Sequence, residues 1–240
     1  MRRVQVIGAH SADFVWRAGG AVAKAVALGG EAEVIALSYG ERGESGELWK
    51  ASDPAHPQTV QNVKRIRHAE ASAAAAHLGA SFRCLDFGDY PLSIGDDRLM
   101  EIAERIREFA PDVLITHTAV DPFNPDHPVA FAAVERARGL AAGAGVSSAF
   151  PTITPPQLFL FEPHQPELCA FVPNVHVDIT SVWDQKVAAM NEMKAQHYLL
   201  TYYAQRGEQR GNHARRASGR QEVRYAESFH RVLPQVVDQL

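Results

Sequence analysis

The chain has 240 residues, of which 46% are hydrophobic and 22% charged, a balance typical of one globular domain, here residues 1–240, with a sizeable core. The formal net charge of -4 is small and gives no reason to expect a nucleic-acid partner. Two cysteines are too few for a disulfide framework and favour a reducing, cytoplasmic setting. The N-terminal apolar run is too short for a signal peptide, and no stretch reaches the roughly 18 apolar residues of a membrane span.

The first half of the chain alternates short apolar runs, typical of buried strands, with longer helical patterns. A polar, Gly-rich loop over residues 39–57 follows the second run. Strands that alternate with helices favour an α/β fold, a Rossmann-like, mostly parallel sheet with helices on both faces. The expected strands are residues 4–9, 32–38, 82–85 and 112–116, and the expected helices are residues 14–28, 59–78 and 97–109.

The second half of the chain is less regular. We interpret residues 203–220, which are basic and contain glycine, as a loop that faces an anionic ligand or, alternatively, as a solvated surface loop. Ligands of open parallel sheets bind beyond the carboxyl ends of the strands, so the site is expected in the loops that follow them. The other expected elements are helices over residues 128–142 and 181–199 and strands over residues 157–161 and 175–178.

Two of these loops carry histidine together with carboxylate side chains. The loop after the first strand contains His10 and Asp13, and the loop after the fourth strand, residues 117–128, contains Asp126 and His127. Two imidazoles and one carboxylate suit a catalytic zinc that keeps one position open for water. The alternative is that each histidine caps a turn or lies on the surface.

The same two segments carry a family resemblance. Residues 9–13 (AHSAD) resemble the AHPDD motif of the PIG-L (LmbE-like) deacetylases, and residues 124–127 (NPDH) resemble the HPDH motif of that family. The likeness covers nearly the whole chain, which implies a PIG-L-like fold. It also includes residues 67–79, 177–180, Lys186 and residues 225–229.

The resemblance implies that His10, Asp13 and His127 hold a zinc ion, for which iron or cobalt could substitute. Asp126 and Asp121 would then orient a ligand imidazole from behind. Asn124, which follows Asp121 in the same loop, would lie beside the ligands.

Two positions depart from the family pattern. Ala12 stands where the family has the aspartate that acts as general base, and Asn124 stands where it has a histidine that helps to stabilise the tetrahedral intermediate. A methyl group cannot accept a proton. The chain is therefore either a decayed enzyme or the catalyst of a different reaction on the same activated water.

Another group must then supply the base. Residues 40–50 (GERGESGELWK) carry three carboxylates on a Gly-rich loop at the functional edge of the sheet, where catalytic groups are common. Glu47 is the first choice for the group that positions and deprotonates the water, because Leu48 and Trp49 can anchor it. Glu44 is the second choice. The alternative is that these glutamates are solvated.

For the acid, the segment Pro163-His164-Gln165-Pro166 holds a histidine between two prolines, just past an expected strand. Histidine titrates near neutral pH, so His164 can donate a proton as well as accept one. A plain surface histidine is the alternative, and His117 and His176 are weaker candidates.

The AHSADF motif, the GERGESGELWK loop and the His164 segment together resemble a branch of the family that hydrates 4-oxalomesaconate (4-carboxy-2-hydroxymuconate) in gallate and protocatechuate catabolism. This resemblance implies addition of water across an activated C=C bond. The substrate is a small anionic polycarboxylate, which arginine side chains can bind in a bidentate manner. The candidate substrate-binding residues are Arg42, Arg67, Arg206, Arg210 and Arg215.

Three alternatives remain at this point. The chain could deacetylate an N-acetyl sugar with Glu47 as a substitute base, or it could bind metal without catalysis. Nucleotide binding is a weaker alternative, because the turn after the first strand lacks the GxGxxG pattern. We expect no membrane partner and a homo-oligomeric assembly.

Overall fold

The computed structural model describes residues 2–53 and 55–239, and its named strands form one seven-stranded sheet with the order β3-β2-β1-β4-β5-β7-β6. The pairs from β3 to β5 are all parallel, whereas β7 runs antiparallel to both β5 and β6. The expected mostly parallel sheet is therefore confirmed, with β7 as an element that was not expected. The strands are β1 Arg3–Gly8, β2 Glu31–Ala36, β3 Ser81–Cys84, β4 Val113–Thr116, β5 Gln157–Phe161, β6 Val175–Asp178 and β7 Ala226–Arg231.

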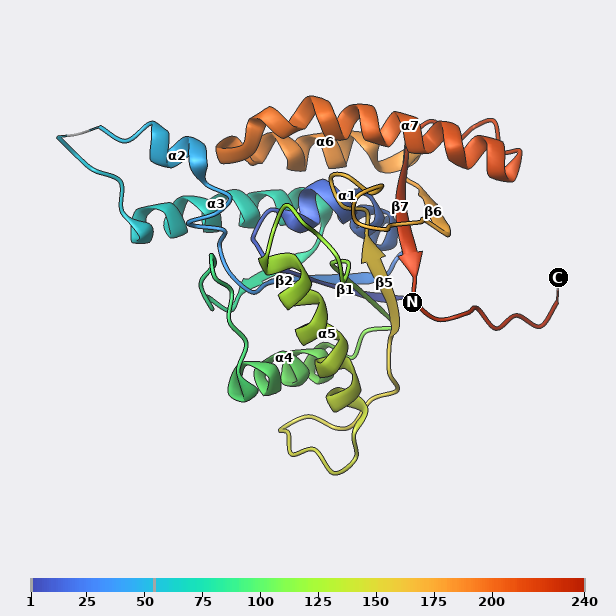
Figure 1. Cartoon of the computed structure of the whole chain (residues 1–240). Coiled ribbons are helices and arrows are strands. Elements are labelled where there is room, and N and C mark those ends of the chain that lie inside the picture. Colours follow the sequence, from blue (N-terminus) through green and yellow to red (C-terminus); the bar gives the residue numbers. More distant parts are fainter. Residues whose placement is uncertain (1, 54, 240) are drawn as a thin grey trace.

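Helices cover both faces of the sheet, as expected. Figure 1 shows α1, α3, α6 and α7 on one side and α4 and α5 on the other. Buried apolar side chains accordingly form two main clusters, one around α1 and α3 and one around α4 and α5. The helices are α1 Asp13–Ala27, α2 Gly46–Lys50, α3 Val60–Leu78, α4 Asp96–Phe109, α5 Asp126–Ala142, α6 Trp183–Glu192 and α7 Leu200–Ser218, with short 3-10 turns η1 Thr180–Val182 and η2 Lys194–Leu199.

Local sequence signals explain the ends of α3. The side chain of Thr59 accepts a hydrogen bond from the backbone N–H of Asn62 at 3.1 Å, which caps the first turn. The helix ends at Gly79, whose φ of +73° lies in the left-handed region that glycine adopts at low cost. Both signals are readable in the sequence, and the helix expected over residues 59–78 agrees with the observed one.

The single helix expected over residues 181–199 is wrong. The chain instead forms η1, α6 and η2, with a break at Met193 and a non-helical residue at Gln196. Side chains from α3 and α1 compete for this segment. The backbone N–H of Ala195 donates to the Glu70 carboxylate at 2.8 Å, and the Gln196 side chain accepts from Arg67 at 2.9 Å. The contact with Glu70 satisfies the Ala195 N–H outside a regular α-helix, and the contact with Arg67 holds the Gln196 side chain at the break.

The loop expected over residues 203–220 is also wrong, because these residues lie mostly within α7. The glycines that suggested a loop are there for close packing. A Cβ atom at Gly207 would lie 2.7 Å from the Trp183 ring, and one at Gly211 would lie 2.0 Å from the backbone oxygen of Arg224. Glycine therefore lets α7 approach its neighbours, and this packing outweighs its low helix propensity.

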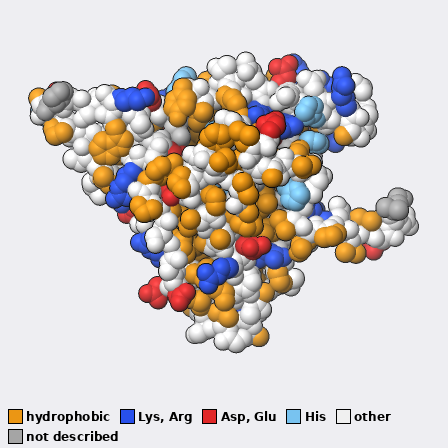
Figure 2. Space-filling model, in the orientation of Figure 1, with side chains coloured by type: hydrophobic (Ala, Val, Ile, Leu, Met, Phe, Trp, Pro, Cys, Tyr) orange, Lys and Arg blue, Asp and Glu red, His pale blue; other side chains and the backbone are white. Residues whose placement is uncertain are grey.

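Charged side chains of both signs are mixed on the face shown in Figure 2. Lys and Arg side chains are scattered among Asp and Glu, with hydrophobic side chains between them. Among the described residues, no helix combines the length and the apolar character that crossing a bilayer requires.

Candidate metal centre

Four side chains from three loops meet at the carboxyl edge of the sheet. They are His10 after β1, Asp13 at the start of α1, Glu44 in the loop after β2 and His127 in the first turn of α5, and their ligand atoms lie within 4.8 Å of one another. The parallel pairing of β1 with both β2 and β4 brings these loops together. The structure therefore places His10, Asp13 and His127 side by side, with Glu44 as a fourth member.

Two ring nitrogens in this cluster lack a hydrogen-bond partner among the described residues, although both are buried: His10 Nδ1 and His127 Nε2. Both face the same two carboxylates. His10 Nδ1 lies 3.3 Å from Glu44 Oε1, and His127 Nε2 lies 3.6 Å from Asp13 Oδ1. A buried, unpaired polar atom is costly, whereas two imidazole nitrogens beside carboxylate oxygens are a donor set that binds divalent metals well. The cluster could therefore hold a metal ion.

The outer nitrogens of both rings are held by carboxylates. His10 Nε2 donates to Asp126 Oδ2 at 3.2 Å, and His127 Nδ1 donates to Asp121 Oδ2 at 2.7 Å. Burial favours the neutral form of Asp121, but the hydrogen bond and charge of His127, together with the Phe123 N–H and the charge of Arg17, outweigh burial and lower the pKa of that carboxyl. A carboxylate behind each ring keeps the proton on the outer nitrogen and turns the lone pair of the inner nitrogen toward the cluster.

Asp13 is held in place by two groups that sequence reasoning undervalued. His117 Nε2 lies 3.0 Å from Asp13 Oδ2, and Arg17 lies 3.5 Å from Asp13 Oδ1. Arg17 is only 4% exposed and also contacts the Nδ1 atoms of His117 and His127, at 3.2 and 3.5 Å. The i,i+4 spacing from Asp13 to Arg17 on α1 was the available signal.

Glu44, the second choice for the base, reaches the cluster, whereas the first choice, Glu47, does not. The side chain of Glu47 is 54% exposed and pairs with Lys50 at 2.9 Å. The Glu44 carboxylate accepts from Asn124 at 3.0 Å and from Gln196 at 3.3 Å. Burial alone would raise the pKa of Glu44, but His10 and His127 hold it well below its ordinary value.

The loop that carries Glu44 explains this difference. The Ser45 hydroxyl donates to the Gly40 carbonyl at 2.8 Å and closes a tight turn, after which α2 begins within the segment expected to be all loop. Asp89 accepts from the backbone N–H groups of Arg42 and Gly43, at 3.0 and 2.7 Å. The turn points Glu44 inward and leaves Glu47 on the solvent side.

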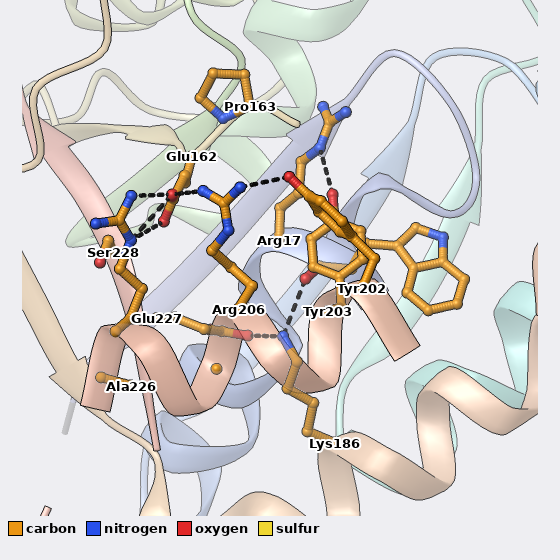
Figure 3. Close-up of a pocket in the computed structure, with 13 residues that line it drawn as sticks. Arg17, Glu162, Pro163, Lys186, Tyr202, Tyr203, Arg206, Ala226, Glu227 and Ser228 are labelled. Carbon is orange, nitrogen blue, oxygen red and sulfur yellow. Dashed lines mark hydrogen bonds and ion pairs between the residues drawn. The ribbon is translucent and has the colours of Figure 1, made fainter. Parts of the chain in front are cut away.

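Four of the arginines that were expected to bind substrate lie outside the Glu44 loop. Each of them contacts another group of the protein. Arg67 is fully buried and donates to Glu70 at 2.7 Å, and Arg215 donates to the Val223 carbonyl at 2.6 Å. Arg206 and Arg210 of α7 both pair with Glu162 at the end of β5 (Figure 3). Because buried charges require partners, the carboxylates of Glu70 and Glu162 hold Arg67, Arg206 and Arg210 in place.

Arg42 and His164 are the two remaining expected site residues, and their surroundings differ. The side chain of Arg42 is 50% exposed, although it donates to the Asp89 carbonyl at 2.8 Å. His164 is largely buried, and burial together with the charge of Arg17 lowers its pKa to about 4. The charges of Glu44, His127 and Asp13 also act on this ring, which places it in the electrostatic reach of the cluster.

The sequence pattern of the GlcNAc-PI de-N-acetylase (PIG-L) family matches residues 5–138, more than half of the chain. This chain belongs to the PIG-L family. The match spans the segments of His10, Asp13, Glu44 and His127, so the family resemblance expected from residues 9–13 and 124–127 is confirmed.

Comparisons with individual proteins show which members of the family this chain resembles. The chain is 42% identical to a 4-oxalmesaconate hydratase of Pseudomonas putida over 238 residues, which are 98% of this chain and 91% of that protein. The chain also superposes on the crystal structure of GalB, the 4-carboxy-2-hydroxymuconate hydratase of Pseudomonas putida, with a TM-score of 0.95. The two sequences are 42% identical, and the match covers 100% of each chain. The N,N'-diacetylchitobiose deacetylase of Pyrococcus horikoshii shares the fold at 19% identity, with a TM-score of 0.75 over 95% of this chain and 83% of that one.

Proposed function

We propose that this PIG-L family protein is a metal-dependent hydratase that adds water across the activated C=C bond of 4-oxalomesaconate (4-carboxy-2-hydroxymuconate). The observation that carries the proposal is the 42% identity to a hydratase of that name over nearly the full chain. The site agrees with it, because Ala12 removes the family's usual base while Glu44 supplies a carboxylate from a different loop.

Zinc is the proposed metal, with His10, Asp13 and His127 as its ligands and iron or cobalt as substitutes. The two unpaired ring nitrogens and the carboxylates behind both imidazoles support this assignment. A bound zinc would make hydroxide available near neutral pH.

In this proposal Glu44 is the general base, the role for which Glu47 was the first choice on sequence alone. The Glu44 carboxylate removes one proton from the attacking water and later releases it. Asn124 and Gln196 donate to the two carboxylate oxygens, which keeps Glu44 ionised and correctly oriented. The place of Asn124 beside the ligands is therefore explained by its hydrogen bond to Glu44.

The substrate in this proposal is a small polycarboxylate. Arg17 adds a buried positive charge at the cluster, and Arg42 adds a half-exposed one on the loop that carries Glu44. The charge of Arg17 is paired with Asp13, whereas half of the Arg42 side chain is open to solvent, so Arg42 is the arginine that favours an anionic ligand. We propose that the His164 side chain contacts the bound substrate.

A second candidate function is deacetylation of an N-acetyl sugar. It is favoured by the family membership and by the presence of Glu44, which could replace the missing aspartate of position 12 as a base. A comparison of substrates separates the two reactions. Zinc-loaded protein is expected to bleach the conjugated absorbance of unsaturated oxo-polycarboxylates and to release no acetate from N-acetylglucosamine derivatives. Acetate release without a change in the polycarboxylate spectrum would support the deacetylase instead.

We also propose that the enzyme is cytoplasmic and works as a homo-oligomer. An apolar groove between α1 and the sheet supports an assembled form, since Leu28 at its rim is 75% exposed. Light scattering is expected to give a mass that is a multiple of 26.3 kDa. A single-chain mass at micromolar concentration would contradict the proposal.

A further inference from the structure

His164 is held by two consecutive tyrosines of α7. The Tyr203 hydroxyl lies 3.1 Å from His164 Nδ1, and the Tyr202 hydroxyl donates to the backbone oxygen of His164. Arg206 donates to the same backbone oxygen at 3.2 Å. The ring and the backbone of His164 are therefore both fixed from one helix.

The direction of the hydrogen bond at Nδ1 follows from Arg17. The Arg17 Nε atom lies 3.4 Å from the Tyr203 hydroxyl oxygen, and a guanidinium can only donate. Figure 3 marks this contact with a dashed line. The Tyr203 oxygen therefore accepts from Arg17, and its own hydrogen has one acceptor among the described residues, His164 Nδ1. Burial raises the pKa of Tyr203 well above its ordinary value, so the hydroxyl keeps this hydrogen.

A ring whose Nδ1 accepts a hydrogen bond must carry its proton on Nε2 when it is neutral. No hydrogen bond joins His164 Nε2 to a residue that the structure describes, so this N–H is free for a substrate. An imidazolium at His164 would have two donors, and the Tyr203 hydroxyl would then lose its acceptor. The low pKa of about 4, caused first by burial, agrees with a neutral ring.

From this series of hydrogen bonds we infer that Arg17 and Tyr203 are positioning residues. They hold His164 as a neutral ring whose Nε2–H donates a hydrogen bond to the substrate. The inference rests on the proposed function and specifies the role of His164, which was expected from the sequence to be an acid. His164 stabilises negative charge on the substrate and does not itself give up a proton.

The hydration balances on these terms. The water oxygen bonds to one carbon of the C=C bond, while Glu44 takes one of the two water protons. The electron pair of the π bond moves onto the conjugated carbonyl oxygen, where the His164 N–H stabilises it as oxyanion-hole donors do. The electron pair then returns to form a C–H bond at the neighbouring carbon with the proton that Glu44 held, and the other water proton remains on the new hydroxyl.

Matched replacements of His164 distinguish a hydrogen-bond donor from a proton-transferring acid. A glutamine amide N–H can take the place of Nε2–H, whereas an asparagine amide is too short and lies near the place of Nδ1. We expect His164→Gln to keep at least tenfold more of the wild-type kcat than His164→Asn. Equal losses of about a hundredfold or more in both variants would indicate acid catalysis by His164 and overturn the inference.

Nitrogen NMR of the zinc-loaded protein tests the locked ring without any substrate. The His164 signals are those missing from the spectrum of His164→Gln, and their shifts tell a protonated nitrogen from an unprotonated one. We expect Nε2–H with bare Nδ1 at neutral pH, and an added Nδ1–H population in a folded Tyr203→Phe variant, whose kcat should fall about tenfold or more at nearly constant KM. An imidazolium or an Nδ1–H ring in the wild type would refute the inference, even if hydratase activity is found. If the wild-type ring carries its proton on Nε2 but the protein has no hydratase activity, the proposed function alone would be refuted.

Discussion

Replacing Glu44 with glutamine is expected to lower turnover by about a hundredfold or more, the range typical of general bases. The amide cannot take a proton from the attacking water, but it has nearly the same shape and can still contact Asn124 and Gln196. Bound metal should remain near the wild-type level, because His10 and His127 keep their inner nitrogens free for it. Steady-state kinetics and elemental analysis of the same preparation measure both quantities.

Glu47→Gln is the matched control for this experiment. Glu47 lies three residues further along the chain and carries the same side chain, and its one ion pair within the described residues is with Lys50 at the surface. Its replacement is expected to leave turnover within about twofold, because exposed ion pairs contribute little. A large loss in Glu47→Gln with normal turnover in Glu44→Gln would contradict the assignment and return the role to Glu47.

The second large effect is expected from the ligands. His10→Ala and His127→Ala should each lose the bound metal, and with it all measurable activity, because two protein ligands rarely retain a catalytic zinc. Inductively coupled plasma analysis after dialysis measures the metal directly. Chelation of the wild type should have the same effect, and added zinc should restore activity.

His77→Ala controls for the loss of a histidine as such. His77 lies at the far end of α3, where it is 44% exposed and pairs with Glu192. Its replacement should leave metal content and activity unchanged. If His10→Ala and His127→Ala also retain their metal, the cluster is not the metal site.

The meeting of His10, Asp13 and His127 at one edge of the sheet was predictable from the sequence because two independent signals agree. Parallel strands bring the loops after β1 and β4 to the same edge, and the motifs at residues 9–13 and 124–127 specify which side chains matter there. The fold was predictable for a related reason. The strands β1, β2 and β4 are short apolar runs, and their order follows from the alternation with helices.

The sequence alone could not show that Glu44, and not Glu47, points toward the cluster. Three glutamates lie within seven residues, and which one points inward depends on the hydrogen bond from Ser45 to Gly40 and on the grip of Asp89 on the loop. Asp89 follows β3 and is remote in sequence. Contacts of this kind are set by tertiary packing and leave no local pattern.

The internal partners of the arginines could not be predicted, for a different physical reason. Composition shows that α7 is basic, but it does not show that Glu162 lies opposite Arg206 and Arg210. A buried carboxylate takes up their charge, and the glycines of α7 serve helix packing. The contact of Arg17 with Asp13, in contrast, could have been predicted, because the two residues lie one helical turn apart on the same side of α1.

Mass spectrometry of the product tests the central claim most directly. Absorbance can change when an unsaturated oxo-acid merely tautomerises, whereas its mass cannot. Zinc-loaded protein incubated with 4-oxalomesaconate is expected to give a product heavier than the substrate by one water molecule, and the His10→Ala protein should give none. An unchanged substrate mass, together with loss of an acetyl group from an N-acetyl sugar under the same conditions, would contradict the hydratase assignment.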